Sequence, residues 1–398
     1  MKKTLIFLFS FSVLLYAQQA IAYVGLCCAK CGGNMPLNII GAGVPETHEF
    51  RFKFSPMVMR MGGLRDGTSP VSLNSLLGSQ NMGGMKMDGE NTSSSGKFMA
   101  APQSMDMNML NFAVGYSFTD DFFAGLMFMY KDNSMPMKFS QSMASMTGQT
   151  GFYMKSSGMA DTMLMTKYRL YTDDPLAPTS QASLFFGLSL PTGSINEKNR
   201  EHPVKARRTE LLPYSMQLGS GTLDPMLGLV YQGSASPWWW GANLIYTARV
   251  FNNARDYNLA DEIRADLYAM YQVSYNLVVQ LQLNARGWGK IEGEADAAAS
   301  GASGRKVAGD PGSGYMTPLW STDNYGGQSL NVTAGVQWQP FALHILDLSV
   351  GIPAYQRLNG PQLEEDYRMM VTWYMELPTA ASVRSKGGRS GEKSRLGF

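Results

Sequence analysis

Short segments of the chain alternate strictly between apolar and polar residues, the pattern of β-strands with two different faces. The clearest runs from Leu277 to Arg286, with leucine and valine on one parity and mostly glutamine and asparagine on the other. Strong segments also occur at 162–171, 262–271, 330–338 and 368–377, and weaker ones at 49–59, 108–118, 122–130, 182–190, 222–231, 239–250 and 343–352. The alternation predicts about twelve strands.

The connections between these strands alternate in length. Those after odd-numbered strands are long (62–106, 131–160, 191–221, 251–260, 288–326 and 353–366), and those after even-numbered strands are short. A soluble antiparallel sandwich also has alternating strands, but short turns at one end and long loops at the other are typical of bacterial outer-membrane barrels. We therefore expect an all-β fold: a monomeric, transmembrane antiparallel β-barrel over residues 49–377, in contact with outer-membrane lipid, with both termini in the periplasm.

Charged residues fix which parity faces inward, because an Arg or Lys facing lipid at mid-depth costs about 2–4 kcal/mol. Mixed charge can line an aqueous pore or lock a filled barrel with ion pairs, and the sequence leaves both open. The predicted lumen residues are Arg51, Lys53, Asp161, Lys167, Arg169, Glu262, Arg264, Asp266, Arg286, Arg368 and Glu376.

The two ends of the chain flank the predicted strands. Residues 1–22 have a Lys-Lys start, an apolar core and a small-residue cleavage site, which predicts a secretory signal peptide. Residues 23–48 then form a periplasmic N-terminal segment. Residues 378–398 are rich in Arg, Lys, Gly and Ser and predict a basic flexible tail. Phe398 ends the chain, as in many barrels that the barrel-assembly machinery inserts.

Composition agrees with a membrane barrel. Charged residues make up 16% of the chain, against about 25% in an ordinary soluble domain, and strands with one lipid-facing side account for the deficit. With a formal net charge of +2, the chain has no large excess of basic residues to bind phosphates, so we expect no nucleic-acid partner.

A family resemblance rests on the stretch from Leu188 to about Glu294. It is carried by Leu190-Pro191-Thr192-Gly193, by LPYSMQLGSGTLDPMLGLVY from Leu212, by WWWGANLIYTAR from Trp238, and by LVVQLQLNARGW from Leu277. This stretch resembles the outer-membrane transporter family named after the meta-pathway of phenol degradation. The resemblance implies a barrel that takes up small, often aromatic, compounds and has no enzyme activity. It implies no ligand-contact residues.

Methionine is the unusual component, with 29 residues. Several form short strings, such as NMGGMKMDG, MDMNM and MPM, within or beside the first two predicted loops. Thioethers are soft, uncharged ligands that suit Cu(I), but methionine is also a flexible apolar filler and a target of oxidation. The candidate metal ligands are Met82, Met85, Met87, Met105, Met107, Met109, Met135 and Met137.

Cys27, Cys28 and Cys31 are the three cysteines of the chain and follow the predicted cleavage site. In an oxidising periplasm, a disulfide between Cys28 and Cys31 is the simple expectation. Soft-metal binding by two or three thiolates is the alternative.

Catalytic residues are scarce, since His48, His202 and His344 are the three histidines and none forms a Ser-His-acid or metal-His pattern. We expect no enzyme and no required cofactor. The sequence favours a channel for a small solute, with Met-rich outer loops that capture copper or another soft metal ion. The alternatives are a channel for hydrophobic or aromatic compounds, and a barrel without transport, plugged by loops or by residues 23–48.

Overall fold

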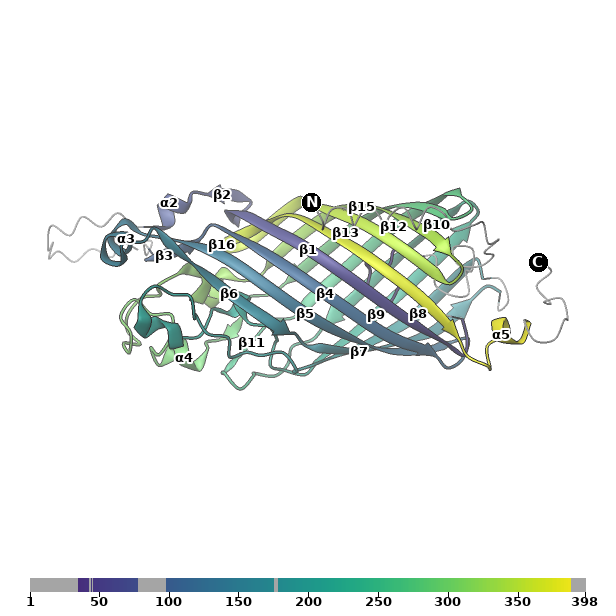
Figure 1. Ribbon diagram of the computed structural model, residues 1–398, viewed down its shortest axis with the longest axis horizontal. Coiled ribbons are helices and arrows are strands. Elements are labelled where there is room, and N and C mark those ends of the chain that lie inside the picture. Colours follow the sequence, from purple (N-terminus) through teal and green to yellow (C-terminus); the bar gives the residue numbers. More distant parts are fainter. Residues whose placement is uncertain (1–34, 43, 45, 78–97, 175–177, 388–398) are drawn as a thin grey trace, which may run out of the picture.

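The computed structural model describes residues 35–42, 44, 46–77, 98–174 and 178–387. Eleven strands close into an antiparallel barrel, because β16 pairs with both β15 and β1 (Figure 1). The other strands pair with their neighbours in chain order. They are β1 (Glu49–Gly67), β4 (Ser104–Ser117), β5 (Phe122–Phe139), β7 (Thr162–Thr172), β8 (Ser180–Leu190), β9 (Asp224–Ala235), β10 (Trp238–Thr247), β12 (Glu262–Ser274), β13 (Leu277–Trp288), β15 (Gly327–Phe341) and β16 (His344–Pro378).

β16 crosses the barrel wall twice. Its first arm pairs with β15 up to Leu358, and its second arm pairs with β1 from Leu358 to Pro378. Between the arms the chain turns at Gly360, whose φ of 69° suits glycine. The described chain therefore makes twelve passes, as the alternation predicts. The long loop expected at 353–366 is wrong, because both arms continue as strand almost to the turn.

One further helix, α5 (Val383–Gly387), follows β16 at the short-turn end, on the right of Figure 1, whereas the remaining elements gather at the long-loop end on the left. None of the described helices is long and apolar enough to cross a membrane. These elements are β2 (Ser69–Val71), α2 (Leu73–Leu76), β3 (Ala100–Pro102), α3 (Gln141–Thr147), β6 (Gly151–Met159), η2 (Lys205–Thr209), η3 (Tyr214–Met216), β11 (Tyr257–Asn258), β14 (Glu292–Gly293), α4 (Asp296–Ala299), η4 (Pro318–Trp320) and η5 (Thr322–Asn324).

Several strands are longer than the sequence pattern predicts. β5 continues to Phe139 and pairs with β6, within the region 131–160 that we expect to be a loop. β1 and β4 are likewise paired as far as Gly62 and Ser104. The wall formed by β1, β4, β5 and β6 is therefore extended at the long-loop end.

The two faces of the wall differ as the parity predicts. The outward face exposes large apolar side chains, which are stable there only against lipid. Aromatic residues lie near the strand ends, as in interfacial girdles. Examples of outward residues are Phe50, Phe54, Leu110, Phe112, Phe118, Phe122, Leu126, Trp238, Ile263, Leu267, Tyr271, Leu281, Leu283, Trp338, Val371 and Trp373.

Candidate functional site: the barrel interior

The segment before β1 lies inside the barrel. Met35, Leu37, Ile39 and Ala42 are buried in one apolar cluster with residues of the barrel wall. The wall residues of this cluster include Met163, Met165, Phe185, Tyr268, Met270 and Tyr374. We call residues 35–44 the plug, because the described part of this segment fills the lumen at this level.

Inward polar side chains hold the main chain of the plug. The Gln337 amide donates to the Met35 carbonyl at 3.0 Å, and the Asn243 amide donates to the Ile40 carbonyl at 3.1 Å. Lys53 and Arg51 donate to the carbonyls of Leu37 and Ala42. Each bond satisfies a backbone oxygen that burial would otherwise leave without a partner. Two of the predicted lumen residues therefore position the plug.

One side-chain pair fixes the plug with particular geometry. The Asn38 amide donates to Gln282 at 3.0 Å, and the Gln282 amide donates back to Asn38 at 2.9 Å. Such a reciprocal pair depends on the position of both chains, so a shift of the plug breaks both bonds at once.

Other predicted lumen residues form ion pairs or hydrogen bonds, some within one strand and some between neighbouring strands. Glu262 pairs with Arg264 and, at 2.7 Å, with Arg286. Arg368 pairs with Glu365 at 2.6 Å, and Asp266 accepts a hydrogen bond from Asn284 at 2.7 Å. Glu376 pairs with Arg384 at 2.5 Å. These pairs join buried carboxylates to guanidinium groups that solvent reaches, since the side chains of Arg264 and Arg286 are 44% and 42% exposed.

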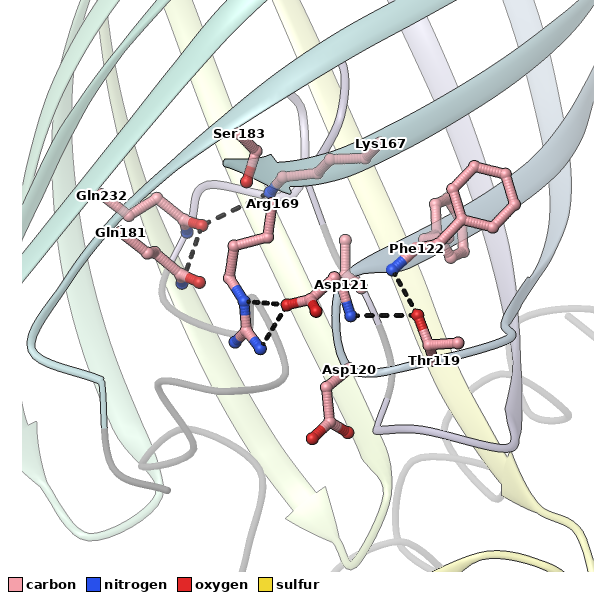
Figure 2. A pocket seen from close by; sticks show the side chains of 11 residues that line it. Thr119, Asp120, Asp121, Phe122, Lys167, Arg169, Gln181, Ser183 and Gln232 are labelled. Atoms are coloured by element: carbon pink, nitrogen blue, oxygen red, sulfur yellow. Dashed lines mark hydrogen bonds and ion pairs between the residues drawn. The ribbon is translucent and has the colours of Figure 1, made fainter. Parts of the chain in front are cut away.

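A pocket opens beside the plug at the short-turn end. It has an empty volume of about 330 Å³, part of it open to solvent, and extends from Val44 to the turn at 119–121. In Figure 2, Arg169 reaches Asp121 with an ion pair of 2.7 Å, while Lys167 points towards Gln232 at 3.4 Å. Lys167 and Arg169, both predicted lumen residues, therefore line this pocket.

Asp161 is a predicted lumen residue, but it lies where β7 begins, at the long-loop end. Its carboxylate accepts hydrogen bonds from the Gly193 amide at 2.9 Å, the Ser220 amide at 2.7 Å and the Ser220 hydroxyl at 3.0 Å. A Cβ at Gly219 would lie 2.7 Å from the Gly193 oxygen, so the two loop segments meet through glycine. The Leu190-Pro191-Thr192-Gly193 and Gly219-Ser220-Gly221-Thr222 elements of the sequence thus form one junction on Asp161.

Methionines form most of a second apolar cluster, above the plug at the long-loop end. This methionine cluster contains Met105, Met135, Met137, Met143, Met154, Met216 and Met316, with Met61, Met99 and Met107 packed against it. The candidate metal ligands Met105, Met107, Met109, Met135 and Met137 lie in β4 and β5, so the placement of Met105, Met135 and Met137 in loops is wrong, whereas Met109 lies in a strand as predicted. Met82, Met85, Met87, Cys27, Cys28 and Cys31 lie outside the described residues.

Sequence reasoning missed the partners of these methionines. Met57, Met59 and Met61 of β1 lie directly opposite Met109, Met107 and Met105 of β4. Met135 of β5 lies opposite Met154 of β6. The signal was present, since PMVMRM and SMDMNM both alternate with the period of two that strands require.

His202 closes the methionine cluster from the loop side. Its buried ring packs edge-on against Phe152, with ring centroids 4.5 Å apart, and its Nδ1 accepts the Val204 amide at 3.1 Å. Burial, aided by the charges of Arg207 and Arg208, lowers the pKa of His202 to about 4. The imidazole is therefore neutral at physiological pH.

An aromatic cluster covers the rest of this end. Tyr214 makes edge-to-face contacts with Tyr257 at 4.7 Å, Trp320 at 5.7 Å and Tyr325 at 5.6 Å between ring centroids. A small pocket lies beside these rings and is lined by Leu211, Leu212 and Gln217 among others. We call the loop segments 191–223 and 289–326 the cap, because their buried residues seal this end of the barrel.

Comparison with known proteins identifies the fold and the family. The chain resembles the COG4313 outer membrane channel from Pseudomonas putida F1, with 12% identity, a TM-score of 0.50, and coverage of 83% of this chain and 96% of that one. The P. putida toluene transporter TodX is more distant, with 10% identity, a TM-score of 0.37, and coverage of 83% and 91%. No curated protein matches the chain. Residues 88–339 match the family described as "Putative MetA-pathway of phenol degradation".

This match spans more than half of the sequence and includes the Asp161 junction and strands β4 to β15. The likeness to the COG4313 channel agrees with a closed barrel whose apolar outer face is suited to lipid. The chain is thus an outer-membrane β-barrel and belongs to the MetA-pathway phenol degradation family.

Proposed function

We propose that the barrel is a channel for small apolar solutes, aromatic compounds among them, that move along the inner wall rather than through an open aqueous pore. The observation that carries this proposal is the composition of the inward face of β1, β4, β5 and β7. Its apolar positions are mostly methionines, from the methionine cluster down to Met127, Met163 and Met165 beside the plug.

Methionine suits such a path because its unbranched side chain rearranges easily and its thioether is polarisable. Met127 and Met163 are directly opposite each other on β5 and β7. The same two methionines meet the plug cluster. A solute that moves from the methionine cluster to these residues passes Lys131 on the inward face of β5, whose ammonium group donates to the Leu218 carbonyl at 3.4 Å. The membership of the chain in a family named after phenol degradation supports aromatic compounds as the solute class.

The plug decides whether the path is open. It lies between the methionine cluster and the pocket lined by Lys167 and Arg169. Passage requires the plug to shift, and the hydrogen bonds from Gln337, Asn243 and Gln282 set the cost of that shift.

Uptake measurements test the solute class. We expect a porin-deficient Gram-negative host that expresses the protein to take up radiolabelled toluene faster than a host without it, and to gain little for radiolabelled glycerol. Equal gains for both solutes would contradict an apolar path. The paired substitutions Met127→Gln and Met163→Gln keep the side-chain length but add a polar group, whose burial costs about 1–3 kcal/mol. Toluene uptake should then fall about tenfold, whereas Met127→Leu with Met163→Leu should retain most of it.

A second candidate function is a barrel without transport, and the plug contacts favour it. In a barrel without transport, release of the plug does not change toluene uptake. A disulfide engineered through Asn38→Cys and Gln282→Cys, with the native cysteines changed to serine, locks the plug in place. For a channel, we expect oxidation to abolish toluene uptake and a reductant to restore it. A non-transporting barrel shows no uptake in either state.

A further inference from the structure

Four methionines lie side by side across four neighbouring strands at the long-loop end. Met61 of β1 is paired with Met105 of β4, and Met135 of β5 is paired with Met154 of β6. The last β4–β5 pair in the ladder is Asp106 with Ser134, so Met105 and Met135 occupy the next position along it. We call Met61, Met105, Met135 and Met154 the methionine row.

The row is compact and sealed. Strands in a sheet are about 4.8 Å apart, and side chains directly opposite each other have Cβ atoms about 4.5–5.5 Å apart. Met105, Met135 and Met154 are buried and Met61 packs against them, so all four face the interior. Methionine has three rotatable side-chain bonds, which allows neighbouring sulfur atoms in the row to meet one ion.

A second observation comes from the row next to it. Met59 is opposite Met107, Met107 is opposite Asn133, and Asn133 is opposite Ser156. Asn133 is 1% exposed; its amide nitrogen donates to Ser156, but its Oδ1 has no hydrogen-bond partner among the described residues. A buried acceptor left unsatisfied costs about 1–3 kcal/mol. A cation held beside it would remove that cost.

Methionine is more frequent on the inward face of the wall than on the outward face. The outward side of the same strands uses Val58, Leu110, Phe112 and Leu126, while the inward side uses methionine at most of its apolar positions. Both faces are apolar, so hydrophobicity alone does not explain the sulfur. Thioethers differ from leucine in being soft ligands for Cu(I) and similar ions.

The surroundings restrict the kind of ion. Within the described chain, no group of three or more His, Cys, Asp or Glu side chains is placed to hold a metal, so a metal in this part relies on thioethers. Lys131, opposite Met109 and two register positions from the row, disfavours a higher charge. We infer that the methionine row binds a soft monovalent metal ion, Cu(I) or Ag(I), at the long-loop end of the lumen.

A Cu(I) titration of the full-length protein in detergent tests this inference. The cysteines are first alkylated with iodoacetamide, because Cys27, Cys28 and Cys31 would otherwise compete as soft ligands. The anaerobic titration against bathocuproine compares the wild type with a variant carrying Met61→Leu, Met105→Leu, Met135→Leu and Met154→Leu. Leucine keeps the apolar bulk and removes the sulfur. The matched control carries Met146→Leu, Met159→Leu and Met369→Leu, which change exposed methionines.

We expect the row variant to bind Cu(I) at least tenfold more weakly and the control to stay within twofold of the wild type. Equal affinity of the wild type and the row variant would overturn the inference, as would loss of all binding on alkylation alone. Heat-modifiable gel mobility checks that each variant is folded.

If the row variant does not fold, Ag(I) is added to wild-type protein labelled with methyl-¹³C methionine, and NMR shows which methionine methyl groups respond to the ion. Shifts at Met105 and Met135, assigned with the single Leu variants, support the site, and unchanged shifts reject it. The inference stands apart from the proposed channel, because Cu(I) affinity is measured without transport and the channel is tested separately through Met127, Met163 and the plug, so either proposal can fail alone.

Discussion

The two halves of the barrel interior are filled in different ways. In the short-turn half, a segment of consecutive turns, the plug, is held by polar side chains that satisfy its main-chain carbonyls. In the long-loop half, side chains alone fill the space, and methionine supplies most of them. One half therefore depends on directional hydrogen bonds and the other on adaptable apolar packing.

This difference indicates how each half responds to change. Directional bonds fail together when the plug moves, since several of them hold one short segment. A methionine cluster instead loses stability gradually, because neighbouring side chains rearrange to fill part of any gap. Four predictions test this contrast, from the largest expected effect to the smallest.

Removal of the plug should have the largest effect. Deletion of residues 36–44 takes away the segment that fills the lumen between Gln337 and Asn243. We expect single-channel conductance in a planar bilayer to rise at least tenfold. The control is a deletion of residues 389–397 in the C-terminal region, which should leave the conductance unchanged. An unchanged conductance after plug deletion would mean that the long-loop half closes the barrel by itself.

Truncation of a cap methionine should open the long-loop half alone. Met216 is fully buried in the methionine cluster, and Met216→Ala should reduce the free energy of local opening by about 2–4 kcal/mol. Hydrogen exchange of residues 211–218 measures this opening. Met146→Ala, at a position with 77% exposure, should change it by less than about 0.5 kcal/mol. Faster exchange in the plug as well would show that the two halves are coupled.

Acid should loosen the same half through His202. The folded cap lowers the pKa of His202 from 6.5 to about 4, so between these values the opened state binds more protons. The stabilisation from neutral His202 is complete above about pH 6.5 and is lost as the pH falls to about 4, a change of at most about 3 kcal/mol. Exchange of residues 199–204 should therefore accelerate over this interval. His202→Phe should remove most of the pH dependence; if the full dependence persists in that variant, another group is responsible.

The Asp161 junction should give the smallest effect. Asp161→Asn replaces one acceptor oxygen by a donor and removes the charge that strengthens the three hydrogen bonds from Gly193 and Ser220. We expect a loss of about 1–2 kcal/mol in the local stability of residues 192–194 and 219–222, measured by hydrogen exchange. Asp66→Asn at an exposed position is the control. An equal effect of both substitutions would contradict the claim that the Asp161 hydrogen bonds stabilise the cap.

Much of the barrel was predictable from the sequence because each strand has two different environments. The run from Leu277 to Arg286 alternates except at Val278, an apolar residue on the inward parity, and its polar side chains do face the interior. The inward placement of Arg51, Lys53 and Glu262 follows from the same argument, since lipid excludes charge.

The errors arise where both faces of a strand look alike or where neither face meets lipid. MDMNM alternates with period two, but the predicted strand begins only at residue 108, because polar Asp106 occupies the parity that faces lipid further along the strand. The second arm of β16 has the same problem near Glu364 and Glu365. The plug could not be located, since its turns have no periodicity and its position depends on contacts with strands more than 200 residues away.

The seam between β1 and β16 also bears on the order in which the barrel forms. Arg384, just after β16, pairs with Glu49 at 3.2 Å and with Glu376, while Ser382 donates to Glu49 at 2.6 Å. Glu49 begins β1 and is fully buried. Both partners follow the last strand of the wall. A sheet that has not closed therefore leaves the Glu49 carboxylate without the Arg384 guanidinium. Closure of the barrel is therefore favoured electrostatically, because the buried carboxylate at the start of β1 gains its partners only when the segment after β16 is in place.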